Sequence, residues 1–208
     1  YSVHTNYAKA WNLIGFDKTS LDTFGQELYD YKTTPNSSTA YDLQTAIPEF
    51  KDVGDIDFAT ILFKTEGIGN GISDYLDNTI AFASFAASKT NPNSLGMLGS
   101  TDSETGTSIW LGVNAPCPLT PDDAKIGFEW NKGSKYWRSM TYAEDTYAGS
   151  KIATRGQAWE VYRTQKLTEA LSFGVSYVLM QYDYTGSNSF FGYDGKPVSI
   201  TDAEADYQ

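Results

Sequence analysis

Cysteine and histidine are almost missing from this chain of 208 residues, which has one of each, Cys117 and His4. A single cysteine excludes an intrachain disulfide. Its place between Pro116 and Pro118 predicts a small buried or turn residue, because proline restricts the residue before it to extended or turn conformations. One histidine is too few for a histidine-based zinc site or for a histidine-driven catalytic triad. We therefore expect no cofactor.

Long apolar runs are also absent. No stretch of 18 apolar residues occurs, which excludes a transmembrane helix but not transmembrane strands, whose alternating pattern gives a weak hydropathy signal. No signal peptide is visible, and the chain starts at Tyr1 rather than at a methionine, so we expect a mature or trimmed piece of a longer protein. Without internal repeats or linkers, residues 1–208 are predicted to form a single domain.

Positive charge is scarce. The chain has 15 Lys and Arg residues against 26 Asp and Glu residues, which gives a formal net charge of −11. A nucleic-acid-binding surface needs cationic side chains to neutralise phosphates. We therefore expect no nucleic-acid partner.

Aromatic residues and glycine are abundant, with 15 Tyr, 11 Phe, 5 Trp and 18 Gly. Tyr and Trp combine an apolar ring with a polar tip, so they suit surfaces that are half apolar and half wet. Membrane interfaces and sugar-binding surfaces are of this kind. Glycine suits frequent tight turns.

The dominant hydrophobic period is two, which predicts strands. In 171–179, Leu171, Phe173 and Val175 point to one side, while Ser172 and Gly174 point to the other. One apolar and one small polar face is typical of a strand with lipid or core on one side and water on the other. With 171–179, similar alternation predicts strands over 7–13, 79–88, 107–113, 125–130 and 157–164, and residues 58–64 are predicted to form a strand with both faces apolar.

These strands predict an antiparallel up-and-down β-barrel of the transmembrane, porin-like kind, or a fragment of a larger barrel. Some connections are short, such as 166–170, whereas 14–57, 89–106 and 131–156 are long and polar. Short turns on one side and long loops on the other are typical of such barrels. No convincing helix is predicted. The best candidate, 20–30, contains Gly25.

Charged and aromatic residues are concentrated in 130–155. A loop that folds into a barrel would bring opposed acidic and basic side chains together, and these would filter solutes by charge. The alternative is a solvated loop with surface ion pairs that contribute little. The candidate pore or constriction residues are Lys132, Lys135, Arg138, Glu144, Asp145, Lys151 and Arg155.

Other acidic groups are weaker candidates. Asp52, Asp55 and Asp57 could offer oxygen ligands to Ca²⁺, but their spacing is not that of an EF-hand, so we expect solvated acidic residues. A glycoside hydrolase would need two carboxylates that face each other across a cleft. Glu129, Glu160 and Asp183 are the candidates, but no nucleophile elbow or phosphate loop accompanies them. We expect no enzymatic activity.

Three stretches together resemble a known family. They are GISDYLDNTIAFAS at 71–84, GTSIWLG at 106–112, and NKGSKYWRS from 131, which continues through Glu144-Asp145 and Arg155-Gly156 to YDYTGS at 182–187. They resemble an uncharacterised family of porin-like outer-membrane proteins of Gram-negative bacteria, which carries a domain-of-unknown-function label. The resemblance implies an outer-membrane β-barrel of which this chain is the C-terminal part, and it implies no activity or functional residue.

The sequence thus predicts an outer-membrane porin-like channel for passive passage of small solutes or cations. Its expected partners are membrane lipids and small solutes, and a homo-oligomer is compatible with this fold. Two alternatives stay open. One is a soluble β-sandwich or jelly-roll module that binds a glycan or a protein, and the other is a structural scaffold of the envelope. The position of Trp and Tyr would separate them, since a barrel puts these residues in bands near strand ends.

Overall fold

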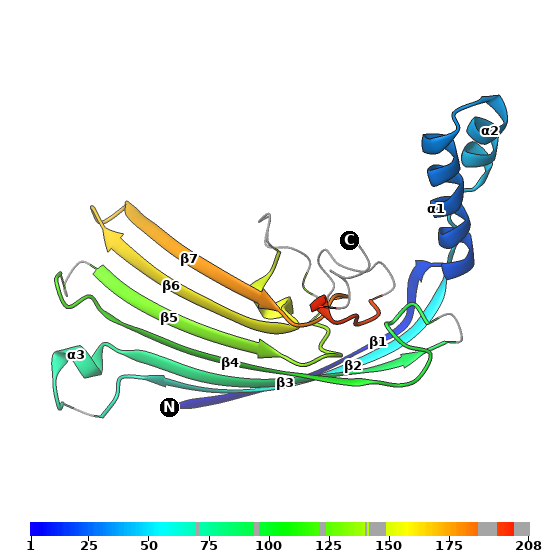
Figure 1. The fold of residues 1–208 in the computed structure, drawn as a ribbon. Coiled ribbons are helices and arrows are strands. Elements are labelled where there is room, and N and C mark those ends of the chain that lie inside the picture. Colours follow the sequence, from blue (N-terminus) through cyan, green and yellow to red (C-terminus); the bar gives the residue numbers. More distant parts are fainter. Residues whose placement is uncertain are drawn as a thin grey trace.

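The structure is a computed structural model that describes residues 1–69, 71–93, 96–120, 124–139, 141, 149–186 and 195–201. Its main element is a seven-stranded sheet in which every strand pairs antiparallel with the next one in the chain (Figure 1). The strands are β1 (Ser2–Phe16), β2 (Phe50–Glu66), β3 (Ile80–Pro92), β4 (Thr105–Pro116), β5 (Ala124–Gly133), β6 (Gly156–Lys166) and β7 (Ser172–Tyr182). The predicted antiparallel all-β fold is confirmed.

The strands are long. The shortest, β5, has 10 residues and the longest, β2, has 17, whereas strands of globular proteins most often have about 5 or 6. Each of the seven predicted strands coincides with an observed one that extends further. Pairing of β1 with β2 continues to Phe16 and Phe50, so the connection predicted over 14–57 is shorter than expected.

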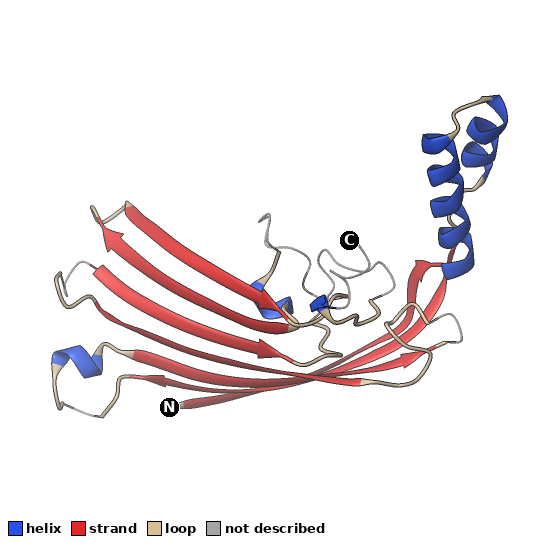
Figure 2. Ribbon diagram, in the orientation of Figure 1, coloured by secondary structure: helices blue, strands red, loops and turns tan. Residues whose placement is uncertain are grey.

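The prediction of no convincing helix is wrong. The chain forms α1 (Lys18–Thr33), α2 (Ser37–Thr45) and the short α3 (Asp74–Asp77), together with a 3₁₀ turn, η1 (Lys151–Ala153). Helices α1 and α2 project beyond the end of the sheet as a helical hairpin (Figure 2). Gly25 does not prevent α1, because a single glycine costs a helix only about 1 kcal/mol. Of the helices described, none is long and apolar enough to cross a membrane.

The sheet is open. Among the described residues, β1 and β7 are its two edges, and Figure 1 shows them apart, so the chain does not close into the predicted barrel. Bacterial barrels of the predicted kind close with an even number of eight or more strands. Seven strands leave a curved sheet.

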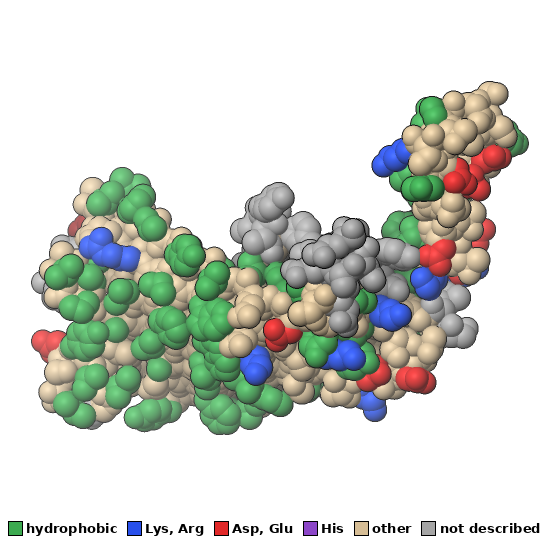
Figure 3. Space-filling model, in the orientation of Figure 1, with side chains coloured by type: hydrophobic (Ala, Val, Ile, Leu, Met, Phe, Trp, Pro, Cys, Tyr) green, Lys and Arg blue, Asp and Glu red, His purple; other side chains and the backbone are tan. Residues whose placement is uncertain are grey.

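The two faces of the sheet differ in chemistry. The register aligns large hydrophobic side chains of neighbouring strands on one side, which we call the apolar face, and most of these side chains are exposed. Figure 3 shows hydrophobic side chains spread over much of the sheet, with charged ones gathered toward the end that carries α1. The apolar face includes Val3, Tyr7, Ile61, Phe63, Phe85, Ile109, Leu111, Val113, Ile126, Phe128, Trp130, Trp159, Val161, Phe173, Val175, Tyr177 and Leu179.

The opposite side, the polar face, carries small and polar side chains. Alternation along the strands gives it Thr60, Ser84, Ser108, Asn131 and Ser176. Glycines on this face leave room for flat aromatic rings. A side chain at Gly112 would overlap the Phe82 ring, and one at Gly127 would overlap the Tyr162 ring.

Near the helical hairpin, polar residues replace the hydrophobic ones on the apolar face. Tyr7, Trp130 and Trp159 are each followed, one step farther along the same face, by a polar residue. Trp130 Nε1 donates to Gln157 Oε1 at 3.2 Å. The polar residues at this boundary are Lys9, Asp57, Lys89, Thr107, Lys132, Gln157 and Gln181.

Candidate functional site

The connection between β5 and β6 folds back onto the polar face. We call its described residues, 134–139, 141 and 149–155, the inner loop. A side chain at Gly106 would overlap the backbone of Tyr136 and Trp137, and one at Gly133 would overlap the carbonyl oxygen of Thr154. Trp137 is buried, and its Nε1 donates to the carbonyl oxygen of Ile152 at 2.7 Å. The absence of side chains at these two glycines lets the loop lie directly on the sheet.

Arg155 fixes the base of the inner loop. Its side chain is 1% exposed. Nε donates to the carbonyl oxygen of Trp137 at 2.9 Å, and Nη1 donates to those of Thr185 and Gly195, both at 2.9 Å. The guanidinium therefore joins the loop to the chain that follows β7. Figure 1 shows both segments within the curve of the sheet.

Lys151, in η1, lies between two carboxylates of the polar face. Glu129 of β5 is directly opposite Glu160 of β6, and like charges in this position repel. Lys151 Nζ lies 2.8 Å from Glu129 Oε2 and also forms an ion pair with Glu160. Trp110 Nε1 donates to Glu129 Oε2 at 2.9 Å, and Lys151 Nζ lies 5.6 Å from the centre of the Trp110 ring. We call these four residues the inner cluster.

The inner cluster has a net negative charge. Burial alone would lower the pKa of Lys151, but the hydrogen bonds and charges of Glu129 and Glu160 raise it above its ordinary value. The ammonium group therefore stays charged and offsets one of the two carboxylates. A polar surface with this balance attracts cations.

The structure brings only some of the predicted constriction residues together. Lys151 and Arg155 lie on the polar face, as described above. The backbone of Arg138 also lies on the polar face, where its N–H donates to Ser88 Oγ at 3.2 Å. Lys135 is exposed, with Nζ 5.3 Å from the ring centre of Tyr136.

One predicted residue, Lys132, lies away from the inner cluster. Lys132 is exposed and alternates with Asn131, so it lies on the opposite side of the sheet, in the polar boundary of the apolar face. The alternation of Trp130 and Lys132 could have indicated this from the sequence. Glu144 and Asp145 lie outside the described residues.

Sequence reasoning missed the partners of Lys151. The sequence offers Glu129 and Glu160 only as candidate hydrolase carboxylates, whereas the structure joins them through one lysine. Asp183 is exposed at the end of β7, where its backbone bonds to Arg155 and Ile200.

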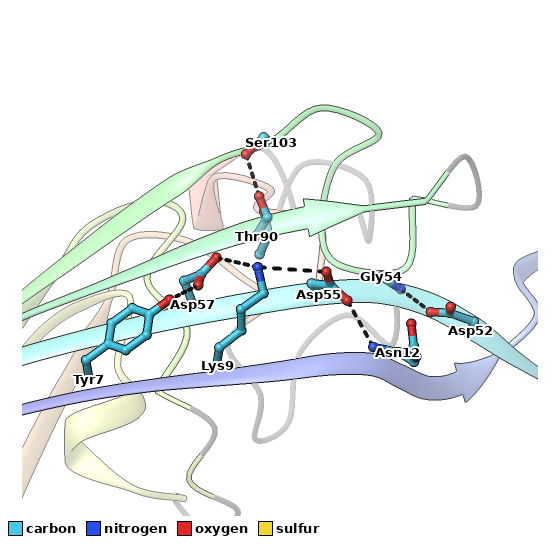
Figure 4. A network of polar contacts seen from close by, with 9 residues as sticks. All are labelled: Tyr7, Lys9, Asn12, Asp52, Gly54, Asp55, Asp57, Thr90 and Ser103. Carbon is cyan, nitrogen blue, oxygen red and sulfur yellow. Dashed lines mark hydrogen bonds and ion pairs between the residues drawn. The ribbon is translucent and has the colours of Figure 1, made fainter.

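The aspartates at the start of β2 form a different network, near the helical hairpin (Figure 4). Lys9 Nζ lies 3.5 Å from Asp57 Oδ2 and 3.9 Å from Asp55 Oδ2, and Tyr7 donates its hydroxyl to Asp57 at 2.5 Å. Asp52 accepts from the N–H of Gly54 at 2.9 Å. These contacts hold the bulged ends of β1 and β2 together. Within the described ranges, no three acidic, cysteine or histidine side chains are grouped to bind a metal.

Cys117 is buried in the turn after β4, as predicted. Hydrogen bonds lower the pKa of its thiol to about 7. The bond with the backbone of Leu119 has the largest effect, and the bond with the side chain of Arg163 has a smaller one. Cys117 belongs neither to the inner cluster nor to the network of Lys9, Asp55 and Asp57.

Comparison with known proteins identifies the family. No curated protein and no solved structure matches the chain. The model of one family, described as "Protein of unknown function (DUF3373)", matches residues 1–208. The chain is therefore a member of the DUF3373 family.

Proposed function

We propose that this chain forms an arc of the wall of an outer-membrane β-barrel that passes small solutes or cations. The apolar face would contact lipid, and the polar face would line a water-filled lumen. The observation that carries the proposal is the exposed apolar face, which ends in aromatic and then polar residues, as do barrels at the edge of a membrane. Strands of 10 to 17 residues support it, since a tilted membrane strand needs about 9–11.

A soluble binding module is supported less well. A β-sandwich covers its apolar face with a second sheet, and the described residues form one sheet only. Large side chains such as Phe128, Val175 and Tyr177 are 46%, 57% and 69% exposed. Apolar patches of this extent mark a membrane or protein interaction surface.

The inner cluster supports a preference for cations. Two carboxylates and one ammonium group leave a negative charge on the polar face, beside the inner loop that would narrow the lumen. The inner loop also bears on the scaffold alternative. A lumen filled by this loop would not pass solutes, which would favour a scaffold over a channel.

The test is to purify the full-length protein from membranes, to determine whether it needs detergent to stay monodisperse, and to record current after it is added to a planar lipid bilayer. Stepwise conductance is expected. Solubility without detergent and no current would contradict the proposal. A detergent-dependent protein without current would support the scaffold alternative.

Charge selectivity can be tested with Glu129→Gln and Glu160→Gln together. We expect the reversal potential in a salt gradient to shift toward weaker cation preference, because the inner cluster loses its net negative charge. Glu169→Gln is the matched control, since this residue is exposed in the turn before β7. Equal shifts of the reversal potential in the double variant and in the control would contradict a position of the inner cluster in the permeation path.

A further inference from the structure

A cavity of about 280 Å³ lies on the polar face, under the inner loop. Its floor comes from neighbouring strands, with Thr60 on β2, Ser84 on β3, Ser108 on β4 and Asn131 on β5. Trp110 lines it as well, and Trp137 of the inner loop contributes from above the sheet. The cavity is next to the inner cluster, with which it shares Trp110.

Several polar groups of the floor have no hydrogen-bond partner in the described part of the chain. The hydroxyls of Thr60 and Ser84 form no hydrogen bond there, and neither does Oδ1 of Asn131, whose side chain is 2% exposed. Asn131 Nδ2 donates to Ser108 Oγ at 3.0 Å, which leaves the proton of Ser108 available. Asn131 Oδ1 is buried without a partner, which is unfavourable, whereas Thr60 and Ser84 are half-buried and their hydroxyls are open to a ligand. A ligand that offers hydroxyls to the floor would therefore gain free energy.

Among the described residues, the lining carries no charge. Apart from the polar groups, it is built of aromatic and aliphatic side chains, and the carboxylates of the neighbouring inner cluster are outside the lining and bound to Lys151. An ion would therefore lose hydration here without a counter-charge. A neutral ligand with an apolar surface and several hydroxyls fits this chemistry.

We infer that this cavity binds a neutral, ring-shaped polyol, such as a single sugar unit. The C–H groups of a sugar ring pack against indole rings, while its hydroxyls bond to Ser, Thr and Asn side chains. Sites for drug-sized ligands have volumes of about 300–1,000 Å³, so the cavity suits one ring. The inference rests on the proposed function in that the sugar would reach the cavity as a solute of the lumen.

The test measures binding separately from conductance. The full-length protein in detergent is titrated with D-glucose, and the intrinsic tryptophan fluorescence is followed, since Trp110 and Trp137 line the cavity. A saturable change is expected. The double variant Thr60→Val, Ser84→Ala should weaken binding at least about tenfold, because it removes two hydrogen bonds. Ser176→Ala, on the same face of β7, is the matched control and should bind as the original protein does.

Sorbitol carries the hydroxyls of glucose on an open chain, with one further hydroxyl in place of the ring oxygen, and tests the requirement for a ring. A response to sorbitol as strong as that to glucose would overturn the ring-shaped part of the inference. No saturable response to glucose, or equal binding by the double variant and the original protein, would overturn all of it.

The two proposals can fail independently. Stepwise conductance without a glucose response would overturn the sugar site and leave the pore. A saturable glucose response, lost in the double variant, in a protein that carries no current would support the site and contradict the pore.

Discussion

Two long connections leave the same end of the sheet and behave in opposite ways. The connection between β1 and β2 forms the helical hairpin, and neither α1 nor α2 contains a buried residue. The inner loop, between β5 and β6, contains buried Trp137, Ala153 and Arg155. One connection projects from the sheet, and the other covers its polar face (Figure 1).

The difference arises from contacts with the sheet rather than from the end at which the connections leave it. The inner loop lies on Gly106 and Gly133, which have no side chains to push it away, and Arg155 closes it with three hydrogen bonds to backbone carbonyls. The helical hairpin satisfies its own backbone through helix hydrogen bonds and caps at Asp17 and Asn36. A connection of the first kind depends on the sheet, and one of the second kind is mainly local.

The largest effect is expected from Arg155→Met. The variant leaves three carbonyl groups without their donor, in two buried hydrogen bonds and one part-buried one, and we expect a loss of stability on the order of 3 kcal/mol together with release of the inner loop. Unfolding in detergent and limited proteolysis would measure both. Arg163→Met is the control, because Arg163 is exposed and its side chain bonds to those of Thr120, Gln165 and Cys117 rather than to backbone carbonyls. A loss no larger than that of the control would contradict the role of Arg155.

A smaller effect is expected from Gly106→Ala. The added methyl group would overlap the backbone of Tyr136 and Trp137, so the inner loop must move, at a loss of about 1–3 kcal/mol. Gly174→Ala on the same face is the control, since its methyl group would meet only Thr164 Cγ2 at an ordinary 3.8 Å. Tryptophan fluorescence and unfolding in detergent would report the change. Unchanged values for Gly106→Ala would mean that the loop does not need the glycine.

The helical hairpin should respond locally. Asn36 caps α2 by accepting from the N–H groups of Ser38 and Thr39, and Asn36→Ala should destabilise this helix by about 1 kcal/mol. Hydrogen exchange of the α2 amides would increase, while conductance and the stability of the sheet would not change. Ser37→Ala, at the first helical position, should have little effect. A change in conductance with Asn36→Ala would show that the hairpin is coupled to the sheet.

The smallest effect concerns pH. A hydrogen bond from the N–H of Ser20, and then the ammonium group of Lys51, hold the pKa of Asp17 below its ordinary value of 3.8. Because the pKa is lowered on folding, the stabilisation of α1 is fully present above pH 3.8 and is lost as pH falls through the lowered pKa. Hydrogen exchange of α1 as a function of pH would detect the loss. Asp17→Asn should remove the pH dependence, and persistence of it would assign the transition to another group.

The strands could be predicted because alternation is a local signal. The alternation predicts that Phe173 and Val175 share a face with Leu171, and β7, which begins at Ser172, has Phe173 and Val175 on one face. The helices were missed because neither buries an apolar stripe, although their caps are visible as Asp17 with Ser20 and as Asn36 with Thr39. Where nothing is buried, hydrophobic periodicity carries no signal.

The site could be predicted only in part. The charged stretch that contains Lys151 and Arg155 is visible in the sequence, and the geometry brings both to the polar face. Their partners depend on long-range information. The contact of Lys151 with Glu129 and Glu160 requires the register of β5 with β6, and the carbonyls that Arg155 bonds belong to residues far away in the chain.

The strand order has a further consequence. Because each of the six pairings is antiparallel, β1 and β7 run in the same direction. A ring of identical copies related by rotation would place β7 of one copy beside β1 of the next in parallel. A ring in which all neighbours are antiparallel therefore requires an odd number of additional strands between these two edges.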